Sequence, residues 1–449
     1  MSDQEKIKQS KKIFFSFLFT IFIFRLPPIY IIPNSIFTSY AIGKLFLIVL
    51  FFITLNLTST DIHKLIANKV LILVLMYFAA TSISIIKTID IFLFWQFFQN
   101  QIFAILIFTI AILLSSKAKL AYSKIINLIS IFACIQITIE SIYILLSQLI
   151  SNYSFVTPIK DIVQKEALDA YLTNLDRSRL SLDSYYEILI PFIIYKLISN
   201  QQKWNTSKYT LLSLLALGMF LSVLSNFRTR IVLITYITSS FAYISWKYFK
   251  KNKLNTALIK KGFYVFLSIL ITAIYLSYQL FGFTIIDRLL LKESDSFGSI
   301  QYRIQSTKTA LMAFTVSPII GVGLGNYGLY NRYQKQSATI TKNQYRSDYN
   351  NAMKYTTHNF ITQSLAETGI TGTILLIGFF LHSFKLDLDS IKRLSYSRNY
   401  NKVPFIISFW SIFIIMFLNP SHTINIIGWL LFTRALIDSN VKTNSRNHP

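Results

Sequence analysis

Long apolar runs, separated by short polar segments, occupy most of the chain. Because a helix needs about 20 mainly apolar residues to cross a bilayer, the runs predict twelve transmembrane helices, near residues 13–32, 37–55, 65–86, 91–114, 125–150, 185–198, 209–224, 231–249, 262–286, 359–384, 403–418 and 424–437. No run shows the alternation that a membrane-embedded barrel requires. The pattern therefore predicts an all-α polytopic membrane protein, a helical bundle that forms a single domain over residues 1–449.

Composition agrees with this prediction. Hydrophobic residues make up 53% and aromatic residues 16% of the sequence, which is more apolar surface than a water-soluble fold can bury. The single cysteine, Cys134, lies inside an apolar run, so the sequence offers no disulfide framework and no cysteine-based metal site. The basic N-terminal segment and the apolar run after it resemble a signal peptide, but no small-residue cleavage site follows. We therefore expect a retained first span.

The formal net charge of +25 does not by itself indicate a nucleic-acid partner, because membrane proteins collect Lys and Arg in their cytoplasmic loops. Basic residues gather in every second loop, for example near residues 117–124, 247–261 and 385–402. This distribution predicts cytoplasmic termini and no nucleic-acid binding. It also places two long segments on the external face, 151–184 and 287–357, the second as a large loop between the ninth and tenth predicted spans.

Two arginines depart from this charge pattern. The short segment SNFRTR places Arg228 and Arg230 at the external membrane face, where the charge rule disfavours them. Long translocated segments are largely exempt from that rule, but this segment is only a few residues long. Both arginines therefore need a reason other than topology.

The large external loop carries further candidate residues. Its segment 299–318 predicts an amphipathic helix whose apolar stripe rests on the membrane, with Arg303 at the edge of that stripe. An arginine in this position can meet a phosphate or simply extend toward lipid headgroups. The following glycine run, GVGLGNYG, matches no nucleotide-binding motif, and a turn with close backbone contacts is its simpler interpretation.

His358 stands where the large external loop re-enters the membrane. A histidine at a helix start is commonly a cap or interface residue, but a neutral imidazole can also take a proton from a hydroxyl group. No second histidine or carboxylate lies beside it at metal-ligand spacing, so the sequence predicts no metal site. On a continuous helix, Gly369 and Gly372 would share its face and let another helix or a substrate approach closely.

These residues suggest one kind of chemistry when they are taken together. Arg228 with Arg230, Arg303 and His358 are all predicted on the same side of the bilayer. Arginine suits the bidentate binding of phosphate oxygens. The combination predicts a reaction in which an alcohol displaces a lipid-borne phosphate.

Three segments within residues 222–380 carry longer motifs. SNFRTRIVLI places Arg228 at a predicted helix start, and RIQSTKTALMAFTVSPIIGVGLGNY has an arginine helix that leads to Pro-x-x-Gly-x-Gly. HNFITQSLAETGITG has a His-Asn pair followed by Gly-x-x-Gly. Together these segments resemble the family of O-antigen ligases and polysaccharide repeat-unit polymerases, membrane glycosyltransferases of the GT-C class. Two positions depart from the family pattern: Phe227 replaces a serine, and Leu375 replaces a glycine found in some ligases.

The resemblance implies a donor glycan on undecaprenyl diphosphate and an acceptor hydroxyl on another lipid-linked glycan, at the external face of the bacterial inner membrane. It implies that Arg228 and Arg303 bind the diphosphate and that His358 orients or deprotonates the acceptor hydroxyl. No cofactor is implied, because the donor arrives activated. Weaker candidates for substrate contact are Arg230, Asn359, Arg177 and Arg179. Chain-length regulator and flippase proteins are the implied protein partners.

Three functions remain open from the sequence. The first is a polymerase of capsule, exopolysaccharide or O-antigen repeat units, and the second is a ligase that moves finished polymer to lipid A core or another acceptor. Leu375 favours the polymerase over the ligase. The third, a flippase for the same lipid-linked glycan, is disfavoured because no repeated half is visible and the candidate residues gather at one membrane face.

Overall fold

The computed structural model describes residues 3–23, 39–58, 65–118, 122, 124–136, 189–199, 295–327, 329, 359–397, 402–418 and 424–438. Across these ranges the regular structure is helical and contains no strand, which confirms the all-α class. The chain divides into two compact units. The first contains residues 1–21, 41–120 and 294–449, and the second contains residues 22–40 and 121–293.

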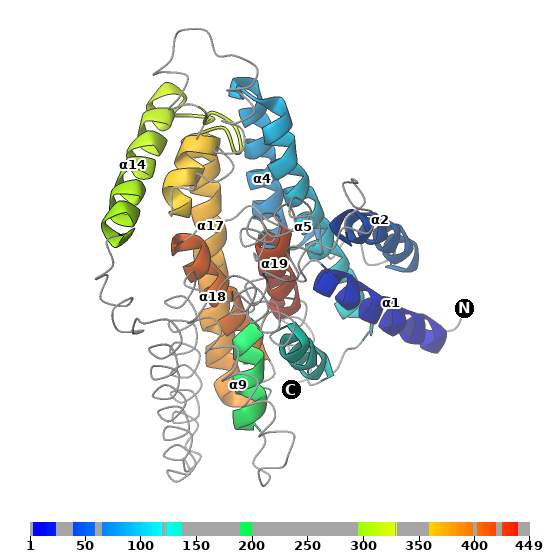
Figure 1. The fold of residues 1–449 in the computed structure, drawn as a ribbon. Helices are drawn as coiled ribbons and strands as arrows, with labels where there is room; N and C mark the ends of the chain where they lie inside the picture. Colours follow the sequence, from blue (N-terminus) through cyan, green and yellow to red (C-terminus); the bar gives the residue numbers. More distant parts are fainter. Residues whose placement is uncertain are drawn as a thin grey trace, which may run out of the picture. The chain divides into compact units, whose positions relative to one another are not determined.

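The first unit is a helical bundle (Figure 1). It holds most of α1 (Asp3–Ile23) and α2 (Ser39–Thr58), then α4 (Lys69–Ile83), the short 3-10 helix η2 (Ser84–Lys87), α5 (Ile91–Ala118), α14 (Asp295–Val316), α17 (Phe360–Ser397), α18 (Val403–Leu418) and α19 (Ile424–Asp438). α17 packs on α4 and α14, while α19 packs on α5 and α18. In the second unit, the helix at 124–136 contacts α9 (Ile190–Ser199), where the Ser130 hydroxyl lies 3.4 Å from the Phe192 carbonyl oxygen.

Within the described ranges, three helical segments are long and apolar enough to cross a membrane: Lys69–Lys87, Ile91–Ser115 and Phe360–Ile391. The predicted bounds of the span at 403–418 coincide with those of α18. α17 continues as helix well beyond the predicted end at residue 384, to Ser397. The predicted spans at 209–224, 231–249 and 262–286 lie outside the described residues, so the count of twelve spans and the place of the large external loop stay predictions.

α17 is broken near its start, and the turn that follows α14 fills the break. Gly369 has φ 66° and ψ −168°, which interrupts the helix. The amides of Val322 and Gly323 donate to the carbonyls of Ala366 and Glu367 at 2.9 and 3.0 Å. In the opposite direction, the amides of Ile370 and Thr371 donate to the carbonyls of Pro318 and Ile319 at 2.8 and 3.3 Å. The turn therefore satisfies backbone groups that the break would otherwise leave without partners.

Glycine is required on both sides of this backbone exchange. Gly321 has φ 75°, and a Cβ atom there would overlap the backbone of Glu367. A Cβ atom on Gly369 would overlap the Ile319 carbonyl group. This geometry confirms that the glycine run forms a turn with close backbone contacts. It also shows that Gly369 admits a backbone turn, whereas the space at Gly372 is taken by the side chain of Thr368 from the same helix.

The turn is also fixed to the connection between α4 and α5. The fully buried Asn326 side chain accepts a hydrogen bond from the Asp90 amide at 2.7 Å and donates to the Asp90 carbonyl at 3.2 Å. The Asp90 carboxylate in turn accepts from the amides of Phe92 and Leu93 in the first turn of α5. The segment between α14 and residue 327 is thus tied to α17 on one side and to the start of α5 on the other.

α14 contacts this assembly through small residues. Ala310 and Ala313 pack in a buried cluster with Ala366 of α17, and Val322 and Tyr327 of the turn complete the cluster. Side chains on the other face, including Leu311 and Met312, are about half exposed, at 45% and 49%. The small residues on the protein-facing side let α14 approach α17 closely.

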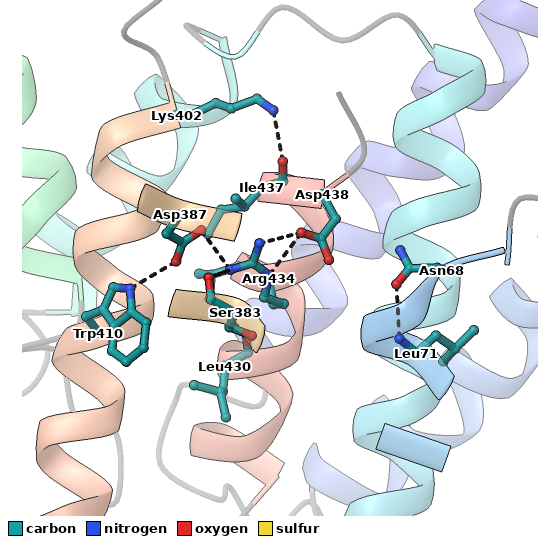
Figure 2. Close-up of polar contacts among 11 residues, drawn as sticks. Asn68, Leu71, Ser383, Asp387, Lys402, Trp410, Leu430, Arg434, Ile437 and Asp438 are labelled. Atoms are coloured by element: carbon teal, nitrogen blue, oxygen red, sulfur yellow. Dashed lines mark hydrogen bonds and ion pairs between the residues drawn. The ribbon is translucent and has the colours of Figure 1, made fainter. Parts of the chain in front are cut away.

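A buried ion cluster joins α17, α18 and α19 (Figure 2). The guanidinium of Arg434 has no exposed surface and donates to the Asp387 carboxylate at 2.8 Å and, through Nε, to Asp438 at 3.0 Å. The Trp410 indole donates to the other Asp387 oxygen at 2.9 Å, and Arg434 lies over the Phe409 ring at 5.5 Å. Breaking such a buried pair typically costs about 3–5 kcal/mol, because the remaining charge is left without compensation. This cluster fixes α17 to α18 and α19 near Asp387.

Lys402, next to this cluster, is held in an environment that disfavours its charge. Its ammonium donates to the Ile437 carbonyl at 2.9 Å, at the end of α19. Burial lowers the pKa of Lys402 to about 8, and the Asp438 carboxylate only partly opposes this effect. Keeping Lys402 charged in this buried position therefore lowers the free energy of unfolding at neutral pH.

Replacing either interlocked glycine by alanine should destabilise the protein. Gly321→Ala and Gly369→Ala each combine a positive φ with steric overlap, and we expect a loss of about 2 kcal/mol or more. Gly378→Ala is the matched control, because nothing lies within 4 Å of the added Cβ atom and alanine is the better helix former by about 0.5–1 kcal/mol. Thermal unfolding of the purified protein in lipid nanodiscs measures all three. Equal melting temperatures for the three variants would contradict the observed packing.

Lys402 should give the protein a distinct stability profile above neutral pH. Between its folded pKa of about 8 and its ordinary value of 10.5, the unfolded chain binds a proton that the folded protein does not. Stability should therefore rise through this window relative to Lys402→Met, by about 2 kcal/mol between pH 7.5 and pH 9.5. Melting temperatures of both proteins at the two pH values test this. Parallel profiles would show that Lys402 titrates as a solvated lysine.

Candidate active site

Most of the candidate residues lie outside the part of the chain that the structure describes. These are Arg177, Arg179, Arg228, Arg230 and His358. Arg303 lies within α14 and Asn359 directly precedes α17. Whether the arginines and the histidine share one pocket therefore remains a prediction.

Asn359 is the N-cap of α17. Its side-chain oxygen accepts hydrogen bonds from the amides of Ile361 at 2.9 Å and Thr362 at 3.5 Å, and its carbonyl accepts from the Thr362 hydroxyl at 3.0 Å. An asparagine in this role satisfies amides at the helix start that have no partner within the helix. Within the His-Asn pair, Asn359 therefore fixes where α17 begins, and His358 is the residue just before it in the sequence.

Arg303 belongs to the helix that carries the interlocked turn. On a helix with 3.6 residues per turn, it shares a face with Ser306, Ala310 and Ala313. All three of these residues are buried, and the alanines contact α17. Arg303 therefore lies two helical turns before that contact in the sequence of α14.

A polar cluster lies on the first turns of α17, directly after the His-Asn pair. The Gln363 amide donates to the Glu367 carboxylate at 3.0 Å, and the Thr373 hydroxyl donates to the Ser364 hydroxyl at 3.1 Å. All four side chains are at least 95% buried. Tyr77 of α4 lines the same pocket as Ser364 and Gln363, which places a second helix beside the cluster.

Sequence reasoning assigned no role to this cluster. The sequence interpretation named none of Gln363, Ser364 and Glu367 as a candidate residue. Polar residues buried within membrane helices are costly and are often functional. The run QSLAETGITGT inside an apolar span was the signal that could have revealed them.

Lys44 is a second feature that the sequence interpretation missed. It lies in α2, where its ammonium donates to the Gln99 side chain of α5 at 3.1 Å and sits 5.2 Å from the centre of the Phe103 ring. A lysine inside the apolar run 41–56 is a signal of an internal polar contact. Across the described ranges, no group of three histidine, cysteine, aspartate or glutamate side chains has the arrangement of a metal site.

Comparison with known proteins finds a match in the part of the chain that carries the motifs. A search of curated proteins found no match. The family model described as O-antigen ligase matches residues 213–377. This range includes Arg228, Arg230, Arg303, His358 and Asn359, whereas Arg177 and Arg179 fall outside it. The match confirms, over residues 213–377, the resemblance to O-antigen ligases that the motifs carry. Together with the long apolar helices, it indicates a membrane protein.

Proposed function

We propose that the protein is a polymerase of lipid-linked oligosaccharide repeat units. It transfers a glycan from undecaprenyl diphosphate to a sugar hydroxyl of another lipid-linked glycan. The reaction takes place at the external face of the bacterial inner membrane, with both termini in the cytoplasm. The family match supports an enzyme that ligates or polymerises glycans, and the more specific activity is our inference from the motifs.

The observation that best supports the proposal is the backbone exchange between two motif segments. Pro318 to Gly323 hydrogen-bonds directly to residues 366–371, although the segments lie more than 40 residues apart in the sequence. The first segment follows the helix that carries Arg303, and the second lies 8 to 13 residues after His358 in the sequence. An arrangement in which the arginine helix and the His-Asn helix are fixed to each other suits a site that must align a donor and an acceptor.

In the proposed reaction, the arginines act on the leaving group. The bond between the anomeric carbon and the diphosphate oxygen breaks, and negative charge develops on the undecaprenyl diphosphate. Arg228 and Arg303 bind the diphosphate oxygens and stabilise that charge. A diphosphate is already a good leaving group, so the mechanism uses neither a nucleotide nor a metal.

His358 acts on the acceptor in the same step. Its neutral imidazole accepts the proton of the sugar hydroxyl while the hydroxyl oxygen attacks the anomeric carbon from the side opposite the diphosphate. The new glycosidic bond forms with inversion, and the proton remains on the imidazole until solvent removes it. Arg230, Asn359, Arg177 and Arg179 are further candidates for substrate contact, with Asn359 limited by the use of its side-chain oxygen as a helix cap.

A ligase is the second candidate. The description of the matching family as O-antigen ligase favours it, and the chemistry of donor activation would be identical. Only the acceptor differs: a finished polymer would be moved to lipid A core or another acceptor. Leu375, at the position of a glycine found in some ligases, favours the polymerase.

Deletion of the gene followed by glycan analysis separates these functions. A polymerase predicts that single repeat units remain on the carrier lipid at the external face. Full-length polymer on the carrier would instead identify a ligase. Repeat units retained at the cytoplasmic face would identify a flippase and contradict transferase activity altogether.

Point variants test the proposed roles of individual residues. Arg228→Lys should lose most of the polymer, because a point charge cannot reproduce the bidentate guanidinium contact. His358→Ala should lose at least 100-fold in transfer rate, as is typical for removal of a general base. His382→Ala, a histidine far along α17, is the matched control and should retain activity. Normal chain lengths from the first two variants at equal protein levels would remove both assignments.

A further inference from the structure

Lys44 is a cation inside an apolar helix of the first unit, and it has no acidic partner among the described residues. It lies in the first half of α2, where its ammonium donates to the Gln99 Oε1 atom of α5 at 3.1 Å. The ammonium also lies 5.2 Å from the centre of the Phe103 ring. No carboxylate in the described ranges forms an ion pair with it. Because an ammonium has three N–H donors, the hydrogen bond to Gln99 leaves donors for another group.

The direction of the Lys44 side chain separates it from a lysine that only reaches for the membrane surface. Such a lysine extends along its own helix until its ammonium meets the headgroups. The Lys44 ammonium instead crosses to α5, where an amide and an aromatic ring hold it. A charge inside a membrane bundle is costly, and residues of this kind commonly mark the binding site or path of a charged ligand. An anion bound beside Lys44 would supply the missing negative charge.

Gln99 adds a second donor beside the ammonium. Its Oε1 atom accepts from Lys44, so the N–H groups of its Nε2 atom lie on the other side of the carboxamide. No described residue accepts a hydrogen bond from this nitrogen. Gln96, one helical turn nearer the start of α5, shares the face of Gln99 and is partly exposed. An ammonium beside carboxamide N–H groups is a set of donors that suits phosphate oxygens.

The position of these donors along α5 fits the headgroup region of a bilayer. Phe92 and Trp95, in the first turns of α5, are 61% and 52% exposed, and exposed aromatic rings near a helix end are typical of the membrane interface. Gln99 follows Trp95 by one turn, about 6 Å along the helix. Phe103 lies one turn deeper, so its ring separates the ammonium from the apolar centre of the bilayer. Leu45, directly after Lys44, is 65% exposed, which places lipid-accessible surface beside the ammonium.

We propose that Lys44 and Gln99 form a binding site for the phosphate group of a membrane lipid, in the leaflet at the start of α5. The Lys44 ammonium and the Gln99 amide nitrogen donate to the phosphate oxygens, and the lipid chain lies along the exposed apolar surface of α2. Asn326 ties the start of α5 to the turn between α14 and α17, so the lipid is held on the same rigid junction. Lipid binding at this site does not depend on the proposed transferase activity.

Photolabelling of the full-length protein in nanodiscs tests the site locally. The probes carry a diazirine on the lipid chain: undecaprenyl diphosphate, phosphatidylglycerol and, as the control without phosphate, undecaprenol. At limiting probe, Lys44→Met should lower the labelling of α2 by a phosphate-bearing probe about tenfold or more, as expected for the loss of a charged hydrogen bond. Lys44→Arg should retain most of the labelling. Lys87→Met is the matched control, because it removes an exposed lysine of η2 just before α5 and should leave the labelling unchanged.

Gln99→Glu separates a phosphate site from a purely structural contact. The new carboxylate has the size of the amide, pairs with Lys44 and repels a phosphate, so labelling should be lost while the melting temperature is kept or raised. Normal labelling of both Gln99→Glu and Lys44→Met, or equal labelling of α2 by undecaprenol, would overturn the proposal.

The two phosphate-bearing probes identify the source of the ligand. Stronger Lys44-dependent labelling by undecaprenyl diphosphate would identify the carrier lipid as the ligand. Stronger Lys44-dependent labelling by phosphatidylglycerol would identify a phospholipid of the bilayer. Either result supports the phosphate site, whereas labelling that does not depend on Lys44 with either probe contradicts it.

Discussion

The backbone exchange between the Pro318–Gly323 turn and the break in α17 is the constraint on which the rest of the first unit depends. A broken helix inside a membrane bundle exposes amides and carbonyls that lipid cannot hydrogen-bond. Here a turn from another part of the chain supplies the missing partners, and glycine at positions 321 and 369 lets the two backbones meet. The same turn is fixed by Asn326 to the start of α5, so α5, α14 and α17 share one rigid junction.

Two buried polar groups inside the bundle show the same need for partners. The Arg434 guanidinium is matched by Asp387 and Asp438, and the Glu367 carboxylate accepts from Gln363. Burying charge or amides at this depth is costly without such partners. The first turns of α17, immediately after His358 in the sequence, carry these buried polar side chains next to the junction. A transferase that handles charged, hydroxyl-rich substrates at a membrane face has a use for a rigid polar support of this kind.

The apolar runs predicted the helical class and several helix bounds, and the glycine run predicted a close-packed turn. Which segments pack against one another could not be predicted from the sequence. The bounds of α18 and the start of α5 followed from apolar runs, and the glycine run was correctly interpreted as a close-packed turn. The break at Gly369 was not foreseen, because a sequence does not show which distant backbone will fill a gap in a helix. The burial of Glu367 was missed for the same reason. The resemblance to O-antigen ligases followed from the motifs around Arg303 and His358, but the relative positions of these side chains remain predicted.

Reconstitution is the most direct test of the central functional claim. The purified protein in liposomes, given undecaprenyl-diphosphate-linked repeat units and no nucleotide, should lengthen the glycan on the carrier and release undecaprenyl diphosphate. Because the arginines are proposed to stabilise the leaving group, an excess of EDTA should not slow the reaction. Failure to lengthen the glycan, under conditions in which the protein is folded and the donor is intact, would contradict the assignment as a polymerase.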